Sequence, residues 1–531
     1  MSKKLIKSGV IVSMMTLISR VLGLIRDVVI ANVMGTGAGA DVFFFANKIP
    51  NFLRRLFAEG AFAQAFVPVL SEYQALDEKN GTDETTRLIA QVSGTLGVVI
   101  TIVTAIGMVA SPVIVALFGF GWFVDWINDG ADAHKFDLAS SLLKITFPYL
   151  WFVSLTALAG AILNTLGKFA VAAFTPVLLN VAIITCAVLL TEYLESASYA
   201  LAWGVFLGGL TQFAFQIPFL YKAGVLVKPQ WAWRAKGVAK IRKLIVPALF
   251  GVSVTQINLL LDTLIASFLV TGSISWLYYA DRLLEFPLGL FGIGIATVIL
   301  PSLSGLVARD DKKAFSHTID WGLRIVSLMG LPALAGLVVL AQPIIMILFM
   351  RGEFSENDVL QVSFALYAYL SGLISFMFIK ILAPGYYARQ DTKTPVKIGI
   401  IAMVANMVFN LMLAPYFGYV GLAIATTLSA TLNALLLYRG LKEGQVFALE
   451  KATKQFFVKL ACSAAAMGAC IAYLSPSFEQ WSVMSFSEQI SNLVIYIVLG
   501  IITYAITVTL LGVRVKDLKV QNSIAQKGID L

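Results

Sequence analysis

Apolar runs of about 20 residues recur along the whole chain and alternate with short polar stretches, which is the pattern of repeated membrane helices. The polar stretches are too short to fold into an extramembrane domain. We therefore expect an all-α polytopic membrane protein. The pattern predicts fourteen helices, near residues 9–34, 40–72, 88–118, 138–166, 174–193, 198–221, 242–270, 274–307, 319–349, 359–388, 395–414, 419–440, 455–474 and 489–511.

Composition excludes several functional classes. The 531 residues are 59% hydrophobic and only 13% charged, and the mean hydropathy is +0.85. The chain contains no phosphate-binding loop of the G-x-x-x-x-G-K-[ST] type, so we expect no ATP hydrolysis. Its two histidines and three cysteines are scattered along the sequence, and we expect neither a metal site nor a cofactor.

The net charge of +9 is a topology signal and does not indicate nucleic-acid binding. Residues 222–243 contain seven basic residues and no acidic residue, whereas residues 119–137 contain four aspartates against one lysine. By the positive-inside rule, the first stretch is cytoplasmic and the second external. An even number of helices then places both termini in the cytoplasm.

A weak internal repeat links two of the predicted helices. FFFANKIPNFLRRLF in the helix at 40–72 aligns with LYYADRLLEFPLGLF in the helix at 274–307, six helices later. Since six is even, the two copies have the same orientation in the membrane. We expect two pseudo-symmetric six-helix lobes, residues 1–222 and 223–441, around a central cationic cavity, with a helix pair and tail at 442–531. Chance similarity between apolar helices is the alternative.

Three predicted helices carry charges at membrane depth. A charged side chain near the bilayer centre costs at least about 3 kcal/mol, so these groups need a wet cavity, a partner or a ligand. Arg20 and Asp27 lie seven residues apart on nearly one face of the first helix, and Arg26 is turned away from Asp27. The other charges are Asp41, Lys48, Arg54, Arg55 and Glu59 in the second helix, and Asp281, Arg282 and Glu285 in the eighth.

The basic side chains outnumber the acids in the deeper part of this set. Guanidinium groups bind phosphate oxygens through paired hydrogen bonds, and a buried surplus of positive charge is costly unless an anion completes it. The set therefore predicts an anionic ligand held at membrane depth, such as a phosphate or pyrophosphate. Salt bridges that hold helices together are the alternative, above all for Asp27, Glu59 and Asp281.

A second polar group lies in the predicted second lobe. Asp262 is surrounded by apolar residues, and Asn406 and Asn410 share a helix face. These three residues suggest a monovalent-cation or proton site, with ordinary hydrogen bonding between helices as the alternative. The last two helices are nearly uncharged and rich in small residues, which suggests a groove for a lipid chain.

The motifs that carry these charges resemble the MurJ/MviN family of lipid II flippases, within the multidrug/oligosaccharidyl-lipid/polysaccharide exporter superfamily. The resemblance covers nearly the whole chain. It depends on SRVLGLIRD at 19–27, KIPNFLRRLFAEGAFAQAFVP at 48–68, LLKITFPY at 142–149, SWLYYADRLLEFP at 275–287 and KILAPGYYARQDTKTPVK at 380–397.

The resemblance implies fourteen helices and transport of the undecaprenyl-pyrophosphate-linked disaccharide-pentapeptide, lipid II, to the outer leaflet of the bacterial cytoplasmic membrane for peptidoglycan synthesis. It implies that helices 13 and 14 hold the lipid tail and that Asp262 corresponds to a ligand where members bind sodium. The cavity residues that it implies are Arg20, Arg26, Asp41, Arg54 and Arg282, surrounded by Ser19, Lys48, Glu59, Asp281 and Glu285.

We expect an alternating-access transporter without enzymatic activity, monomeric and in contact with membrane lipids; association with cell-wall synthesis enzymes is a further hypothesis. Proton, sodium or the membrane potential could supply the energy. A drug/cation antiporter or a polysaccharide-lipid exporter of the same superfamily is one alternative; a membrane-embedded lipid-phosphate or glycosyl transferase, or a scaffold for cell-wall enzymes, is another. The antiporter predicts an acid-rich cavity, and the transferase predicts clustered acids or histidines at one membrane face, neither of which the sequence shows.

Overall fold

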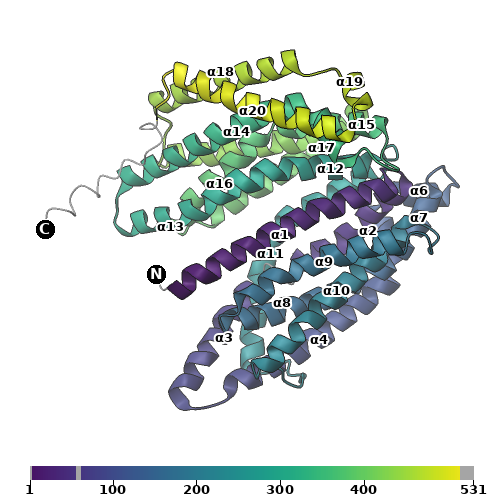
Figure 1. Cartoon of the computed structure of the whole chain (residues 1–531). Helices are drawn as coiled ribbons and strands as arrows, with labels where there is room; N and C mark the ends of the chain where they lie inside the picture. The colour runs from purple at the N-terminus through teal and green to yellow at the C-terminus, as the bar shows by residue number, and fades with distance from the viewer. Residues whose placement is uncertain (1–2, 56–60, 515–531) are drawn as a thin grey trace. The chain divides into compact units, whose positions relative to one another are not determined.

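Helices make up every regular element in the described part of the chain. The computed structural model describes residues 3–55 and 61–514, and in this part of the chain the regular elements are α-helices and one π-helical segment (Figure 1). The predicted fold class, an all-α polytopic membrane protein, is confirmed. The chain divides into two compact units, residues 1–275 with 351–354, and residues 276–350 with 355–531.

The first unit contains eleven helices and the first turn of a twelfth. They are α1 (Lys3–Met34), α2 (Ala38–Arg54), α3 (Ala61–Asn80), α4 (Glu84–Val109), α5 (Ser111–Phe118), α6 (Phe120–Ile127), α7 (Ala133–Thr146), α8 (Tyr149–Thr165), α9 (Phe169–Leu189), α10 (Ala197–Lys222) and α11 (Lys236–Ala266).

The second unit continues from the twelfth helix to the end of the described chain. Its elements are α12 (Ser273–Pro287), the π-helix η2 (Leu288–Ile293), α13 (Gly294–Ala308), α14 (Lys312–Phe349), α15 (Glu356–Leu370), α16 (Leu373–Tyr387), α17 (Lys393–Glu443), α18 (Lys451–Leu474), α19 (Phe478–Val483) and α20 (Phe486–Leu510). The predicted lobes were defined by internal repetition and not by contacts, so their boundary at residue 222 stays a prediction.

Nine helices in the described residues are long and apolar enough to cross a membrane, or ten if α15 and α16, bent by 41°, form one span. The predicted number of fourteen stays a prediction. Where the sequence predicted single helices at 88–118 and 359–388, the structure has the pairs α4 with α5 and α15 with α16. The predicted helices at 395–414 and 419–440 correspond to the two parts of α17, which are separated by a non-helical residue, Gly418, whose φ of 57° favours glycine.

Packing in the first unit depends on small residues and on a large apolar cluster. Gly204 and Gly208 lie one turn apart on α10 where it contacts α9, and a Cβ on Gly204 would come within 2.9 Å of the Ile183 backbone. Such glycines let membrane helices approach closely. The cluster joins α3, α4, α8, α10 and α11, with Phe62 and Phe66 stacked inside it.

In the second unit, α18 and α20 pack against α14 (Figure 1). Apolar residues form most of this contact, and one buried ionic group lies within it. Asp320 Oδ2 accepts from Arg324 Nε at 2.7 Å and from Thr453 Oγ1 at 2.8 Å, and Arg324 Nη2 donates to Thr453 Oγ1 at 2.6 Å. The threonine hydroxyl therefore links α18 to the charged pair on α14.

We expect Thr453→Val to lower the free energy of unfolding by about 1–3 kcal/mol, because it leaves the buried Asp320 and Arg324 with fewer partners at unchanged side-chain volume. Thermal unfolding in detergent measures the effect. Thr509→Val is the matched control, since Thr509 is exposed on α20 and donates only to backbone carbonyls of its own helix. Equal melting temperatures for the two variants contradict the assignment.

A carboxylate beyond the predicted span 40–72 organises the connection from α3 to α4. Asp77 accepts from the Thr82 hydroxyl at 2.6 Å, from Glu84 N at 2.9 Å and from Thr85 N at 2.8 Å. These hydrogen bonds lower the pKa of Asp77 from its ordinary 3.8 to about 2, and the bond from the Thr82 hydroxyl contributes most. The folded-state pKa is depressed, so the stabilisation is complete above about pH 4 and is lost as the pH falls through about 2.

We expect amide-exchange protection factors of Glu84 and Thr85 to stay constant from about pH 5 to 9, well above both pKa values of Asp77. Asp77→Asn removes the charged acceptor and should lower these protection factors at pH 7. Glu78→Gln, at an exposed neighbouring position, should leave them unchanged. If the protection factors of Glu84 and Thr85 change between about pH 5 and 9, the assignment of Asp77 as their charged acceptor is contradicted.

Candidate functional site

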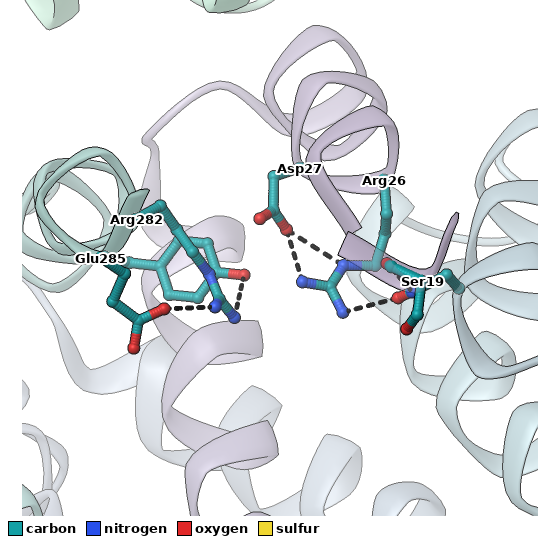
Figure 2. Close-up of polar contacts among 7 residues, drawn as sticks. Ser19, Arg26, Asp27, Arg282 and Glu285 are labelled. Carbon is teal, nitrogen blue, oxygen red and sulfur yellow. Dashed lines mark hydrogen bonds and ion pairs between the residues drawn. The ribbon is translucent and has the colours of Figure 1, made fainter. Parts of the chain in front are cut away.

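The predicted site residues of α1 form a polar bridge to α9. The guanidinium of Arg26 turns back along the helix, and its Nε and Nη2 donate to Asp27 Oδ1 at 3.0 and 2.7 Å. Arg26 Nη1 donates to Asn180 Oδ1 at 3.0 Å, and Asn180 Nδ2 donates to the Ser19 carbonyl at 3.1 Å. Figure 2 shows Arg26 between Asp27 and the side of the helix that carries Ser19.

The partner of Asp27 is therefore Arg26 and not Arg20, although Arg20 and Asp27 share a helix face in the sequence pattern. Seven residues along a helix separate the Cα atoms of Arg20 and Asp27 by about 10 Å. At that distance, the guanidinium and the carboxylate touch only if both side chains extend toward each other. Arg20 is exposed and has no hydrogen bond or ion pair with any residue in the described part of the chain. Asp27 is 3% exposed.

On α2, the basic side chains are oriented by neighbours within the first unit. Lys48 Nζ donates to Thr263 Oγ1 on α11 at 3.1 Å, and Arg54 Nε donates to Asn51 Oδ1 at 3.2 Å. Lys48 and Arg54 are half-buried, and Arg55 is exposed. Glu59, another predicted site residue of the second helix, lies outside the described residues.

The carboxylate of Asp41 is fully engaged at the start of α12. It is 2% exposed and accepts from Gly272 N at 2.7 Å, from Ser275 N at 2.8 Å and from Ser275 Oγ at 2.6 Å. A carboxylate that binds the first N–H groups of a helix stabilises that helix end through hydrogen bonds and through the helix dipole. The geometry gives Asp41 a structural task, and the predicted substrate contact of Asp41 stays a prediction.

Arg282 in the second unit is oriented by two residues of its own helix. Its Nη1 donates to Glu285 Oε2 at 3.0 Å, and its Nη2 donates to the Tyr278 hydroxyl at 3.3 Å. Figure 2 shows the carboxylate of Glu285 beside the Arg282 guanidinium. The Arg282 side chain remains 38% exposed, and Asp281 on the same helix is also exposed.

The predicted ion site is described only in part. Asn406 and Asn410 are fully buried on α17, and Asn410 Nδ2 donates to Asn406 Oδ1 at 2.9 Å. Asp262 lies half-buried on α11 in the first unit, so a site that joins all three residues stays a prediction. Within the described residues, no group of three or more His, Cys, Asp and Glu side chains could hold a metal ion.

Sequence reasoning missed the polar residues that orient the charges, namely Asn180, Thr263 and Tyr278. Asn180 is the one amide side chain in the otherwise largely apolar helix α9, which is the signal that could have found it. Tyr278 could have been found from its spacing, since it lies four residues before Arg282 on α12.

The charges on α1 and α2 remain positive in total after this pairing. Residues 11–55 contain five basic side chains and two acidic ones, Asp27 and Asp41, and both acids are buried and hydrogen-bonded. Guanidinium and ammonium groups at membrane depth bind oxygen-rich anions. The fold and these side chains define a polytopic membrane transporter suited to an anionic cargo.

Comparison with known proteins identifies the family within this class of membrane transporters. A family model described as lipid II flippase MurJ matches residues 30–511. A probable lipid II flippase MurJ of Vibrio cholerae is 62% identical over 518 residues, covering 98% of both chains, and its counterpart from Haemophilus influenzae is 62% identical over 514 residues, covering 96% of this chain and all of the other. The chain belongs to the lipid II flippase MurJ family.

Solved structures agree with this assignment. A lipid II flippase MurJ in an inward closed conformation superposes with a TM-score of 0.79 at 28% identity and covers 96% of this chain and 99% of its own. An inward-facing multidrug resistance transporter of the MATE family superposes with a TM-score of 0.67 at 14% identity and covers 84% of this chain and 99% of its own. The second likeness concerns the fold alone.

We expect Asn180→Leu to loosen α1 where Arg26 and the Ser19 carbonyl lose their partner on α9. Amide exchange of residues 19–27 should become faster, since a polar link between two membrane helices is replaced by apolar contact. Val181→Ala, at the exposed neighbouring position of α9, is the control. If both variants exchange like the unmodified chain, the bridge does not hold α1.

Proposed function

We propose that this chain transfers lipid II, the undecaprenyl-pyrophosphate-linked disaccharide-pentapeptide, from the inner to the outer leaflet of the bacterial cytoplasmic membrane. The observation that carries the proposal is the surplus of basic side chains on α1 and α2 in a member of this family. Relatives at 62% identity are named probable lipid II flippases, which supports the same cargo. The cargo serves peptidoglycan synthesis outside the membrane.

The pyrophosphate of the cargo is the group that the basic residues bind. We assign the binding role to Arg20, Arg26, Lys48, Arg54 and Arg282. Paired N–H donors of a guanidinium suit phosphate oxygens, and a diphosphate supplies the negative charge that a cationic chamber needs. Asp27 and Glu285 orient Arg26 and Arg282 through the ion pairs at 2.7 and 3.0 Å.

The headgroup crosses by alternating access, while the prenyl chain stays in lipid beside α18 and α20. The exposure of α20 supports this placement, because only 11% of its most apolar stretch is buried inside the protein. A helix with that exposure contacts lipid chains along most of its length. The two helices follow the part of the chain predicted to form the second lobe.

Direction comes from the membrane potential or from a coupled ion. One elementary charge across 100 mV corresponds to about 2.3 kcal/mol, and a field that is negative inside favours outward movement of an anion. A proton or sodium ion bound by Asp262, Asn406 and Asn410 could bias the same cycle. Both termini lie in the cytoplasm, and the protein works as a monomer, with cell-wall synthesis enzymes as possible neighbours.

A drug/cation antiporter fits the described side chains less well. Such a carrier needs carboxylates that accept an organic cation, and Asp27 and Asp41 already accept hydrogen bonds from Arg26, Gly272 and Ser275. A phosphotransferase or glycosyltransferase needs clustered acids or histidines, and the described residues contain no such metal-binding group.

We expect Arg26→Ala to reduce transfer of lipid II at least about tenfold, which corresponds to about 1.4 kcal/mol, because it removes a guanidinium oriented by Asp27 and Asn180. In cells depleted of their own flippase, transfer is measured as the fraction of labelled precursor that an externally added hydrolase cleaves. Arg87→Ala removes an equal charge from an exposed position on α4 and is the matched control.

Normal transfer by membrane-inserted Arg26→Ala contradicts the assignment of the binding residue. Failure of the unmodified chain to expose any precursor contradicts the proposed cargo. Uptake of lipophilic cations by vesicles that contain the unmodified chain favours the antiporter instead.

A further inference from the structure

A lysine that neither the sequence motifs nor the candidate site includes is buried in the first unit. Lys135 on α7 is 1% exposed, and its Nζ donates to Thr271 Oγ1 at 2.7 Å and pairs with Asp132 Oδ2 at 2.9 Å. The ring of Trp122 lies 5.9 Å away. Lysine is almost never fully buried unless it is paired, so these contacts require an explanation.

The residue that Lys135 holds belongs to the turn between α11 and α12. Asp132 is a local partner, three residues away in the sequence, but Thr271 is 136 residues away. The hydrogen bond from an ammonium to the Thr271 hydroxyl is charge-assisted and so roughly twice as strong as a neutral one. Lys135 therefore connects α7 to the turn that precedes α12.

Two further contacts hold the same turn. Gly121 N on α6 donates to Ser267 Oγ at 3.0 Å, before Thr271, and Asp41 accepts from Gly272 and Ser275 directly after it. A Cβ on Gly121 would come within 2.4 Å of the Ser267 carbonyl oxygen, so the backbones already touch. Residues 267–275 are thus fixed to α6, α7 and α2 in sequence, all within the first unit.

The chain leaves the first unit immediately after this turn. Ser275 is the last residue of the first unit before Trp276 begins the second. Arg282 follows seven residues after Ser275 on α12, about 10 Å along the same helix axis. Any change in the direction in which α12 starts is carried to Arg282, because the helix between them is unbroken.

We propose that Lys135 is a positioning residue for transport: its bond to Thr271 fixes the turn 267–275 and so the direction of the helix that carries Arg282. The inference depends on the proposed function only for the cargo. The Asp41 carboxylate holds Gly272 and Ser275, directly after Thr271, so groups of opposite charge bind neighbouring residues of one turn. Loss of either side of the Lys135–Thr271 bond should have the same consequence.

The test compares Lys135→Met, Thr271→Val and the double variant of the full-length protein in liposomes. We expect each single variant to increase amide exchange of residues 267–276 and to slow lipid II transfer at least about fivefold, while lipid II affinity stays within about twofold. The double variant should be no worse than the poorer single variant, because both remove one bond. Thr271→Ser keeps the hydroxyl and should restore both measurements.

Lys144→Met is the matched control, since Lys144 is exposed on the same helix. Unchanged exchange of residues 267–276 in the two single variants overturns the proposal, as does faster exchange with an unchanged transfer rate. A slow Lys135→Met beside a normal Thr271→Val also overturns it, because the lysine then acts through Asp132 alone. If the unmodified chain transfers no lipid II, the proposed function fails, and the exchange measurements alone decide whether Lys135 holds the turn.

Discussion

Every feature of the candidate site follows from the cost of a charge at membrane depth. Arg26 and Asp27 lower that cost by forming an ion pair, and the hydrogen bond from Arg26 to Asn180 connects this pair on α1 to α9. A buried ion pair contributes little net stability, because desolvation offsets most of the attraction. Asp27 therefore orients Arg26 more than it stabilises the fold, and Asn180 provides the polar contact between the two helices.

The acids on α1 and α2 do not neutralise the basic side chains. Asp27 orients one guanidinium, and Asp41 is used at the first turn of α12, where its carboxylate binds backbone N–H groups. The remaining positive charge suits an anionic cargo, and in this family that cargo is lipid-linked. A fold that this chain shares with a multidrug resistance transporter does not by itself imply the same substrate.

Several helices with charged residues or their neighbours are also interrupted. α12 ends at Pro287 and continues as the π-helix η2 before α13, and α15 meets α16 at a bend of 41°. Proline removes a backbone hydrogen bond, and π-helical segments occur often at functional sites. The turn at 267–275 fixes the start of α12, and η2 interrupts the regular helix after Pro287. A helix of this kind can bend at the interruption while its first turn stays in place.

Hydropathy alone determined the class of this protein, since apolar runs of about 20 residues cross a membrane as helices, which satisfy their own backbone hydrogen bonds. The motifs around Arg26, Arg54 and Arg282 also determined the family and the candidate residues. Contacts in the folded chain decided which polar side chains pair with one another. The sequence places Arg20 and Asp27 on one face, yet a long flexible side chain let the adjacent Arg26 reach the carboxylate. Asn180, Thr263 and Lys135 acquired their tasks only through folding, because their partners lie in other helices or in the turn at 267–275, and hydropathy does not record which polar groups meet.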